Sequence, residues 1–546
     1  MKHSSKYLSM ALAAVLLTGC SAPAVQNSSQ SAETPADVQT DATEAIAEEA
    51  TEKERPQVEQ KTLPVLSITT KSTDPDVMKF VTEPVAEHVA EAIASWTPGY
   101  KIPIAPYYEE CTVTLTDADG ISLLADADAQ VKVRGNWTTV YEKKPLRIKF
   151  TDKTNMLGLC DGADQRNWLL LAEYKDGSML RNKAAFSAAK EILGADGLYS
   201  TDSEFVTVEI NGEYYGVYLL TDMQQVSSHR VDITEPEPEY TGTDIGYFLE
   251  FDGYFYNEDE LHGFHVDYAD NAALIPYDGN DGTGNRIKCL PSSIIDPKDD
   301  VGFTIKSEIN SQEQHDFIEN FVNNTYRIMY EAAYNDKAFV FDDDYSSISE
   351  TSDITPQEAV EKVVNVDSLA DTYIISDLTC DADIYWSSFY MDVDFGENGD
   401  RKLTFEAPWD FDSSMGNKDR CINGAGFYAC SIVPDVNGNV YKTCNPWLVV
   451  LAYEDWYQDI IKEKWTRAYD GGVFDRAIGL VENDSAALQD EFTKNYDKWD
   501  NIKHNEDFVN ELSEPAAACK TEQEAADFLA DWLRKRVDWL NTKWHK

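Results

Sequence analysis

The first half of the chain alternates apolar and polar positions, which is typical of β-strands because their neighbouring side chains point to opposite faces. The clearest case is the pair of segments 205–210 and 214–220, which flank an Asn211-Gly212 turn and therefore predict a β-hairpin. The same alternation predicts strands at residues 64–69, 111–115, 131–134, 146–150, 168–171, 246–251 and 389–391. These segments together predict a mixed or antiparallel sheet.

Apolar positions that return every three or four residues predict helices, mostly in the second half of the chain. Residues 179–193 form an amphipathic pattern in which Leu180, Ala184, Ala188 and Ile192 make the core face. Further helices are expected at residues 312–333, 356–363 and 366–378 and throughout 446–546, which ends in an apolar stripe at 525–544. The fold class is therefore α+β, with a sheet-rich N-terminal part and a helical C-terminal part.

The N-terminal segment has the order of a bacterial lipoprotein signal peptide over residues 1–20. Lys2 and Lys6 precede an apolar stretch that is too short to span a bilayer, and this stretch closes on Leu17-Thr18-Gly19-Cys20. Cys20 would become the lipidated first residue of an exported protein, so we expect a lipid anchor to the cell membrane and an extracytoplasmic location. Residues 21–61 are polar and predict a disordered linker. Residues 62–546 form the folded body, with an insertion at about 254–305.

Charge and composition exclude several classes of function. A formal net charge of -52 excludes nucleic acid as a partner, because the phosphate backbone requires clusters of Lys and Arg. Nine cysteines leave eight after Cys20, which permits disulfides in an exported chain, and Cys421, Cys430 and Cys444 are close in sequence. The sequence has no GxSxG, HExxH or GxxxxGK[ST] motif, which excludes the commonest hydrolase, metalloprotease and P-loop classes. The oligomeric state stays open.

Two successive segments carry carboxylates at the ends of predicted elements. Asp410 and Asp412 follow a short strand pattern, and Asp381 and Asp383 lie between a predicted helix and the strand at 389–391. Such a pair of segments can hold a divalent metal beside a proton acceptor. The alternative is that these are ordinary Asp-rich turns in a chain with 98 acidic residues.

Cations gather around the predicted turn that follows residue 134. A Gly-containing turn with two cations on the next strand can hold a polyphosphate, and a solvated strand face is the alternative. The candidates for binding phosphate in this region are Arg134, Asn136, Lys144, Arg147 and Lys149.

Arg181 and Lys183 lie in the first turn of the helix at 179–193. Cations at that end oppose the helix dipole unless an anionic ligand lies nearby. These two residues are therefore further candidates for phosphate binding.

An ordered series of motifs resembles the spore-coat protein H (CotH) kinase family. The motifs run from residue 62 to the end of the chain: LPVLSITT, VKVRGNWT, KKPLRIKF, WLLLAEYKDGSMLRNKAAF, VEINGEYYGVYLLTD, GYFLEFDG, CDADIYWSSFYM, APWDFDSSMG and FLADWLRKRVDWLN. The resemblance implies an atypical protein-kinase-like, two-lobed fold and ATP- and Mg- or Mn-dependent phosphorylation of Ser/Thr in secreted or surface proteins. It also implies that Asp383 is the catalytic residue, that Asp410 and Asp412 hold the metal, and that Lys149 pairs with the nucleotide phosphates.

Some residues depart from the pattern that the resemblance implies. The family usually has Asn where Asp381 stands and one or two Asn where Ser387 and Ser388 stand, and a kinase Asn at such a place assists the second metal. A catalytically weak or inactive surface scaffold is therefore the second hypothesis. A third interprets Asp410-x-Asp412 as a glycosyltransferase motif, which no nucleotide-sugar pattern precedes. Asp394-Phe395-Gly396 spells the kinase metal triplet, and we interpret Asp394 as a hairpin residue instead.

Overall fold

The computed structural model divides the chain into Met1–Gln57 and a compact body, Val58–Lys546. The structure describes residues 58–72, 108–135, 137–253, 255, 258, 261–271, 274–275, 277, 302–381, 383–385, 387–418, 422, 424–429, 445–502 and 511–546. Several predictions concern residues outside this part: the signal peptide with Cys20, the linker up to residue 57, Asn136, most of the insertion at 254–305, and Cys421, Cys430 and Cys444. Everything below concerns the body.

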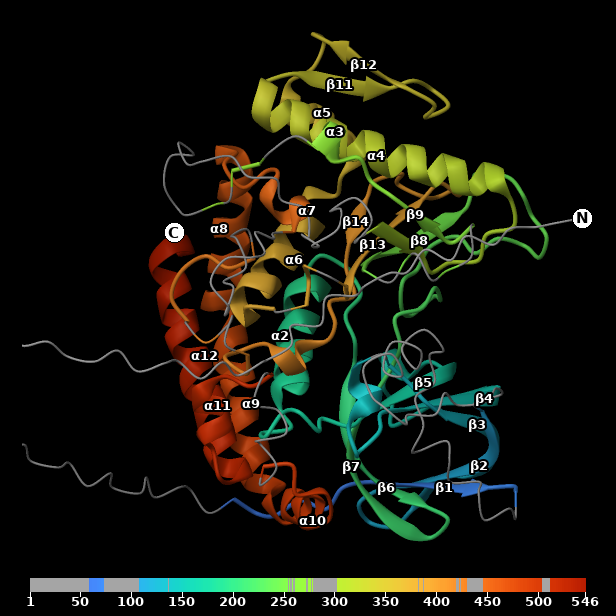
Figure 1. Cartoon of the computed structure of the whole chain (residues 1–546), viewed down its shortest axis with the longest axis vertical. Coiled ribbons are helices and arrows are strands. Elements are labelled where there is room, and N and C mark those ends of the chain that lie inside the picture. The colour runs from blue at the N-terminus through green and yellow to red at the C-terminus, as the bar shows by residue number, and fades with distance from the viewer. Residues whose placement is uncertain are drawn as a thin grey trace, which may run out of the picture. The chain divides into compact units, whose positions relative to one another are not determined.

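Seven strands of the N-terminal part form a closed barrel (Figure 1). They are β1 (Val65–Thr70), β2 (Glu109–Thr116), β3 (Ser122–Val133), β4 (Leu146–Thr154), β5 (Gln165–Leu171), β6 (Ser203–Ile210) and β7 (Glu213–Thr221). Their order is β1-β2-β3-β4-β5-β7-β6, and the barrel closes where β1 runs parallel to β6, with Leu66 opposite Val208. The predicted strands and the mixed sheet are confirmed, whereas the closure carries no local sequence signal.

A second sheet of five strands lies beyond the barrel along the chain. Its strands are β8 (Gly246–Asp252), β9 (Gly263–Phe264), β10 (Gly302–Ile305), β13 (Phe389–Asp394) and β14 (Thr404–Phe405), in the order β14-β13-β8-β10-β9. All neighbours are antiparallel. One face carries Leu249, Phe251, Met391 and Phe405 into the main hydrophobic core. The opposite face combines the stacked aromatic rings of Phe248 and Tyr390 with polar side chains such as Asp392.

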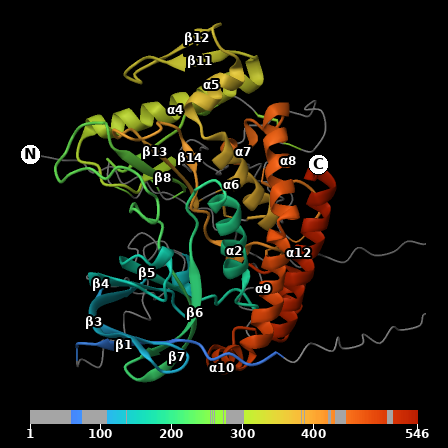
Figure 2. The ribbon, with the colours of Figure 1, turned by 180° about the vertical axis from the view of Figure 1, so that it is seen from behind.

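Helix α4 (Gln312–Asn335) lies between this sheet and the small hairpin of β11 (Ala338–Phe341) and β12 (Ile348–Thr351), as Figures 1 and 2 show from opposite sides. The helix begins with a capping box, in which Ser311 accepts a hydrogen bond from the backbone of Gln314 and the Gln314 side chain bonds back. Helices α3 (Tyr268–Asn271) and α5 (Pro356–Val363) pack beside it. The helices predicted at 312–333 and 356–363 are confirmed.

The remaining helices form a layer beside both sheets (Figure 2). They are α2 (Arg181–Gly194), α6 (Val366–Thr379), α7 (Pro446–Val449), α8 (Asp455–Asp470), α9 (Val473–Ala487), α10 (Gln489–Trp499), α11 (Glu514–Ala518) and α12 (Glu522–Trp544). The core face predicted for α2 is confirmed, since Leu180, Ala184, Ala188 and Ile192 are all buried. No helix among the described residues is long and apolar enough to cross a membrane.

Candidate active site

Asp410 and Asp412 lie on a loop with an unusual backbone, which we call the carboxylate loop (residues 406–416). This loop follows β14 and includes a short 3-10 helix, η6 (Phe411–Ser413). Ala407, Asp410 and Met415 have positive φ angles of 58°, 69° and 48°, a region that residues other than glycine rarely adopt. Such conformations persist only where surrounding contacts hold them, and they are concentrated at functional sites.

The segment between β5 and α2 supplies those contacts. Lys175 Nζ lies 3.0 Å from Asp412 Oδ1 and also donates to the Ser413 hydroxyl. Asn182 accepts a hydrogen bond of 2.8 Å from the backbone N–H of Phe411, and its own amide group donates to Glu173 at 3.0 Å. The sequence around 173–182 therefore fixes the position of both aspartates.

Arg181 strengthens the same attachment from the start of α2. Its side chain is almost fully buried, forms an ion pair with Asp176, and donates to the backbone oxygens of Ser414 at 3.2 Å and Met415 at 3.4 Å. The cation predicted to bind phosphate thus makes its contacts with the protein's own carboxylate and carbonyl groups.

Lys183 is used in a similar way. It donates to the backbone oxygen of Ser203 and lies 3.3 Å from a Glu204 carboxylate oxygen. The structure does not place Lys183 among the residues around the carboxylate loop.

The end of α6 brings the second pair of carboxylates to the site. Cys380 ends the helix in the left-handed conformation, which turns the chain toward Asp381 and Asp383. Asp381 is buried and accepts a hydrogen bond of 3.0 Å from the backbone N–H of Asp383. The Asp383 side chain is about one quarter exposed and lies 4.0 Å from Lys418 Nζ. The predicted catalytic residue is therefore accessible from outside the protein.

The four carboxylates are close enough to affect one another. Burial raises the pKa of Asp410 to about 7, and the charges of Asp412 and Asp383 add to this, while Lys175 and Arg134 oppose it. Burial and the charge of Asp383 raise the pKa of Asp381 well above its ordinary range. Burial lowers the pKa of Lys175, but the surrounding carboxylates outweigh it and hold the pKa above the ordinary value. The site therefore holds more acidic groups than cations, and Lys175 lies among them.

A cavity opens between the carboxylate loop and the barrel. Its lining combines the two aspartates of the carboxylate loop with cations, an acid, an amide and an aromatic ring. The lining residues include Arg134, Lys143, Glu173, Lys175, Asn182, Trp409, Asp410 and Asp412. Its free volume of about 30 Å³ is enough for water, which needs about 10–15 Å³ on the same measure.

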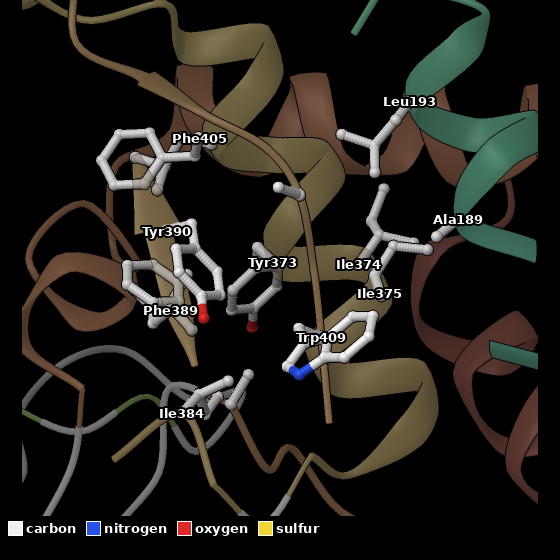
Figure 3. Close-up of a cluster of buried hydrophobic side chains, with 14 of the residues drawn as sticks. Ala189, Leu193, Tyr373, Ile374, Ile375, Ile384, Phe389, Tyr390, Phe405 and Trp409 are labelled. Atoms are coloured by element: carbon white, nitrogen blue, oxygen red, sulfur yellow. The ribbon is translucent and has the colours of Figure 1, made fainter. Parts of the chain in front are cut away.

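Two groups in this cavity have no hydrogen-bond or ion-pair partner among the described residues. The guanidinium of Arg134 lies over the Trp409 ring at 5.7 Å and makes no hydrogen bond or ion pair with a described residue. The carboxylate of Asp410 likewise accepts no hydrogen bond from the part of the chain that the structure describes. Trp409 itself is held by stacking on Phe186, with ring centroids 5.3 Å apart, and lies beside the buried residues of α6 (Figure 3).

The other barrel cations have different surroundings. Lys143 is buried and donates to the backbone oxygens of Ala172, at 2.8 Å, and Val217, and burial lowers its pKa to about 7. Lys144 donates to the Thr139 oxygen at 2.6 Å, and burial lowers its pKa to about 8. Lys144 does not line the cavity.

Arg147 and Lys149 project outward from β4, as the alternation predicts. Side chains that point outward from a closed barrel face solvent, and neither Arg147 nor Lys149 lines the cavity. Arg147 donates to Asn167 on the next strand at 2.9 Å, and Lys149 is exposed opposite the same residue. The structure therefore brings together Arg134, Lys143 and Lys175 with the carboxylates, and it places Lys149 elsewhere.

The donor set fits a divalent metal. Asp410 offers an unpaired carboxylate, and Asp412, two residues away, offers oxygens that already face a cation, Lys175. Carboxylate oxygens are the ligands that Mg²⁺ and Mn²⁺ prefer. Asp394, in contrast, ends β13 and accepts hydrogen bonds from the N–H and hydroxyl of Thr234 and the N–H of Gly396. This is the hairpin role predicted for it.

Sequence reasoning missed Lys175, Lys143, Glu173 and Asn182. Lys175 lies in a loop without periodicity, so its only signal was its place in the motif WLLLAEYKDGSMLRNKAAF. It also missed Arg536 of α12, whose fully buried guanidinium pairs with Asp377 near the end of α6. Arg536 also donates to the backbone oxygens of Asp377 at 2.8 Å and Gly426 at 2.6 Å.

A carboxylate loop with positive-φ residues, a cationic barrel wall and the cavity between them define an α+β protein in which cations and carboxylates meet at one site. The family model described as CotH kinase protein matches residues 131–540, which is more than half of the chain. The chain therefore belongs to the CotH kinase family. A comparison with curated proteins gives no match.

Proposed function

We propose that this chain is an atypical Ser/Thr protein kinase that transfers the terminal phosphate of ATP to secreted or surface proteins. The observation that carries the proposal is the cavity in which the Arg134 guanidinium and the Asp410 carboxylate, both without a hydrogen-bond partner in the described part of the chain, lie with the Lys175–Asp412 pair. Phosphoryl transfer needs positioning and cancellation of charge more than covalent chemistry. This mixture of unpaired cation and carboxylate suits a polyphosphate with its metal.

Each residue has a role in this proposal. Asp410 and Asp412 would hold Mg²⁺ or Mn²⁺, which neutralises charge on the phosphates when it is bound. Arg134 and Lys175 contact phosphate oxygens, and the Arg134 fork can do so with two parallel hydrogen bonds. Asp383, which is accessible, accepts or orients the proton of the attacking hydroxyl. The barrel and the helical part act as the two lobes, and the adenosine part of ATP lies outside the small cavity.

We further propose that the protein acts outside the cytoplasm, tethered by a lipid on Cys20. The support is the sequence of residues 1–20 alone. Labelling of the expressed chain with a fatty-acid analogue, compared with Cys20→Ala, tests the anchor independently of the kinase activity.

The test of the kinase is transfer of labelled phosphate from ATP by the purified full chain with Mg²⁺ or Mn²⁺ and secreted acceptor proteins. Asp383→Asn should reduce transfer by far more than about tenfold, the equivalent of 1.4 kcal/mol of barrier, and leave nucleotide affinity nearly unchanged. Asp394→Asn is the matched control and should transfer normally. Retention of transfer within tenfold of wild type by Asp383→Asn would contradict the assignment.

A non-catalytic surface scaffold is the second candidate. It is favoured by Ser387 and Ser388, which stand where the resemblance implies metal-assisting Asn residues. The backbone N–H of Ser387 donates to the backbone oxygen of Asp383 at 3.1 Å, and that of Ser388 donates to the Glu250 carboxylate at 3.2 Å. Nucleotide binding without measurable transfer under all metal conditions would support this candidate.

A further inference from the structure

The face of the five-stranded sheet that carries Phe248 and Tyr390 also holds a second group of carboxylates, apart from those around the cavity. Asp392 lies in the middle of β13, opposite Thr404 of β14, and Glu406 follows two residues later. Because alternate residues of a strand share a face, Asp392, Thr404 and Glu406 all point away from the apolar face that carries Met391 and Phe405. Both carboxylates are buried, with exposed fractions of 6% for Asp392 and 7% for Glu406.

Among the described residues, no cation forms an ion pair with either carboxylate. The Oδ2 atom of Asp392 is buried and has no hydrogen-bond donor in the same part of the chain. Glu406 accepts a hydrogen bond of 2.7 Å from the backbone N–H of Tyr199. The charges that act on the pair come from further acids: Asp400 and Asp394 raise the pKa of Asp392, and Asp232 raises the pKa of Glu406.

A buried carboxylate without a counter-ion is costly, so the group takes up a proton or binds a cation. Burial together with Glu406 raises the pKa of Asp392, which is the expected response of the pair when no cation is bound. Two buried carboxylates, one on β13 and one directly after β14, instead offer the oxygen ligands that Ca²⁺ prefers.

We propose that Asp392 and Glu406 bind a divalent cation of the calcium type at a structural site distinct from Asp410 and Asp412. Carboxylate oxygens of Asp392 and Glu406 are the protein ligands, and water completes the coordination. This inference goes beyond the proposed kinase activity and does not depend on it.

The position gives the cation a definite effect. It joins β13 to the residue that follows β14, and the backbone of Ala407, next in sequence, donates a hydrogen bond of 3.1 Å to the Tyr199 oxygen before the strained loop begins. A cation on Glu406 therefore braces the start of the segment that carries Asp410.

The experiment is calorimetric titration of Ca²⁺ into the chelator-treated full chain, in a background with Asp410→Asn and Asp412→Asn so that the cavity does not contribute. We expect one binding site and a Ca²⁺-dependent rise in Tm in this background. Asp392→Asn and Glu406→Gln should each weaken binding by about tenfold or more, because each removes a charged ligand. Asp394→Asn on the same strand face removes a charge that acts on Asp392 but no proposed ligand, because Asp394 already accepts three hydrogen bonds, so it should weaken binding less than either of these substitutions.

The result that would overturn the proposal is equally direct. No Ca²⁺-dependent change in heat or in Tm in the chelator-treated protein would mean that the pair holds a proton instead. Unaltered affinity in both Asp392→Asn and Glu406→Gln would place the cation elsewhere. Since the Tm measurement uses the protein with Asp392 and Glu406 intact, a variant that fails to fold does not remove the test.

Discussion

At the scale of single residues, the sequence predicts which face of a strand a side chain lies on, but not whether that face meets a ligand, the core or solvent. Alternation correctly placed Arg147 and Lys149 on one face of β4. Whether that face meets a ligand or solvent depends on how the sheet closes, and here it meets solvent. Lys175, in an irregular loop, reaches Asp412 because the loop between β5 and α2 is folded against the carboxylate segment.

A prediction follows for these two lysines. Lys175→Met should reduce phosphate transfer by about 10²- to 10³-fold, the usual loss when one fixed charge is removed from a reacting phosphoryl or acyl group. Lys149→Met should leave transfer and nucleotide affinity unchanged, because Lys149 is exposed on the outer face of the barrel. Steady-state transfer rates and nucleotide affinities of both variants decide the matter. A larger loss in Lys149→Met would restore the role that the family resemblance implies for it.

At the scale of elements, most strands and helices were predictable because their amphipathic periodicity is local. The hairpin of β6 and β7 around Asn211 and Gly212 and the core face of α2 are cases in point. The parallel pairing of β1 with β6 joins distant segments and leaves no periodic signature, so the barrel could not be predicted. The same limit hid Arg536, which looks like an ordinary member of a charged helix until its burial against Asp377 is known.

Helix α12 offers a matched pair of arginines for a stability test. Arg536→Met leaves the Asp377 carboxylate buried without its cation and should lower the free energy of unfolding by about 3–5 kcal/mol. Arg534→Met removes a partly exposed pair with Glu482 and should cost about 0–1 kcal/mol. Urea unfolding of both variants, followed by circular dichroism, measures the difference. Equal effects would show that the buried pair does not anchor α12 to α6.

At the scale of the whole molecule, acidity should make stability depend on pH. Asp222 joins the barrel to the segment before β8, and burial raises its pKa from 3.8 to about 6, although Arg230 lies 3.9 Å away. The folded state therefore binds more protons than the unfolded state between these values. A net charge of -52 adds repulsion that grows as the surface carboxylates ionise.

The contribution of Asp222 to the free energy of unfolding should accordingly fall as pH rises from about 4 through 6 and level off above about 7. Asp222→Asn should flatten the slope of stability against pH in this range, because the amide does not titrate. Added salt should raise Tm by screening the surface charges and should leave the contribution of the buried Asp222 in place. Thermal unfolding at several pH values and two salt concentrations, with chelator present, separates the two effects. An unchanged slope in Asp222→Asn would show that the pH dependence comes from other groups.

The contact between Arg536 and Asp377 has a consequence for biosynthesis. The two residues are separated by 159 positions, so a ribosome synthesises Asp377 long before the cation that pairs with it. A growing chain, or one cut before α12, therefore lacks the ion pair that attaches α12 to the end of α6. The end of α6, which leads into Asp381 and Asp383, gains this attachment only once α12 has been made.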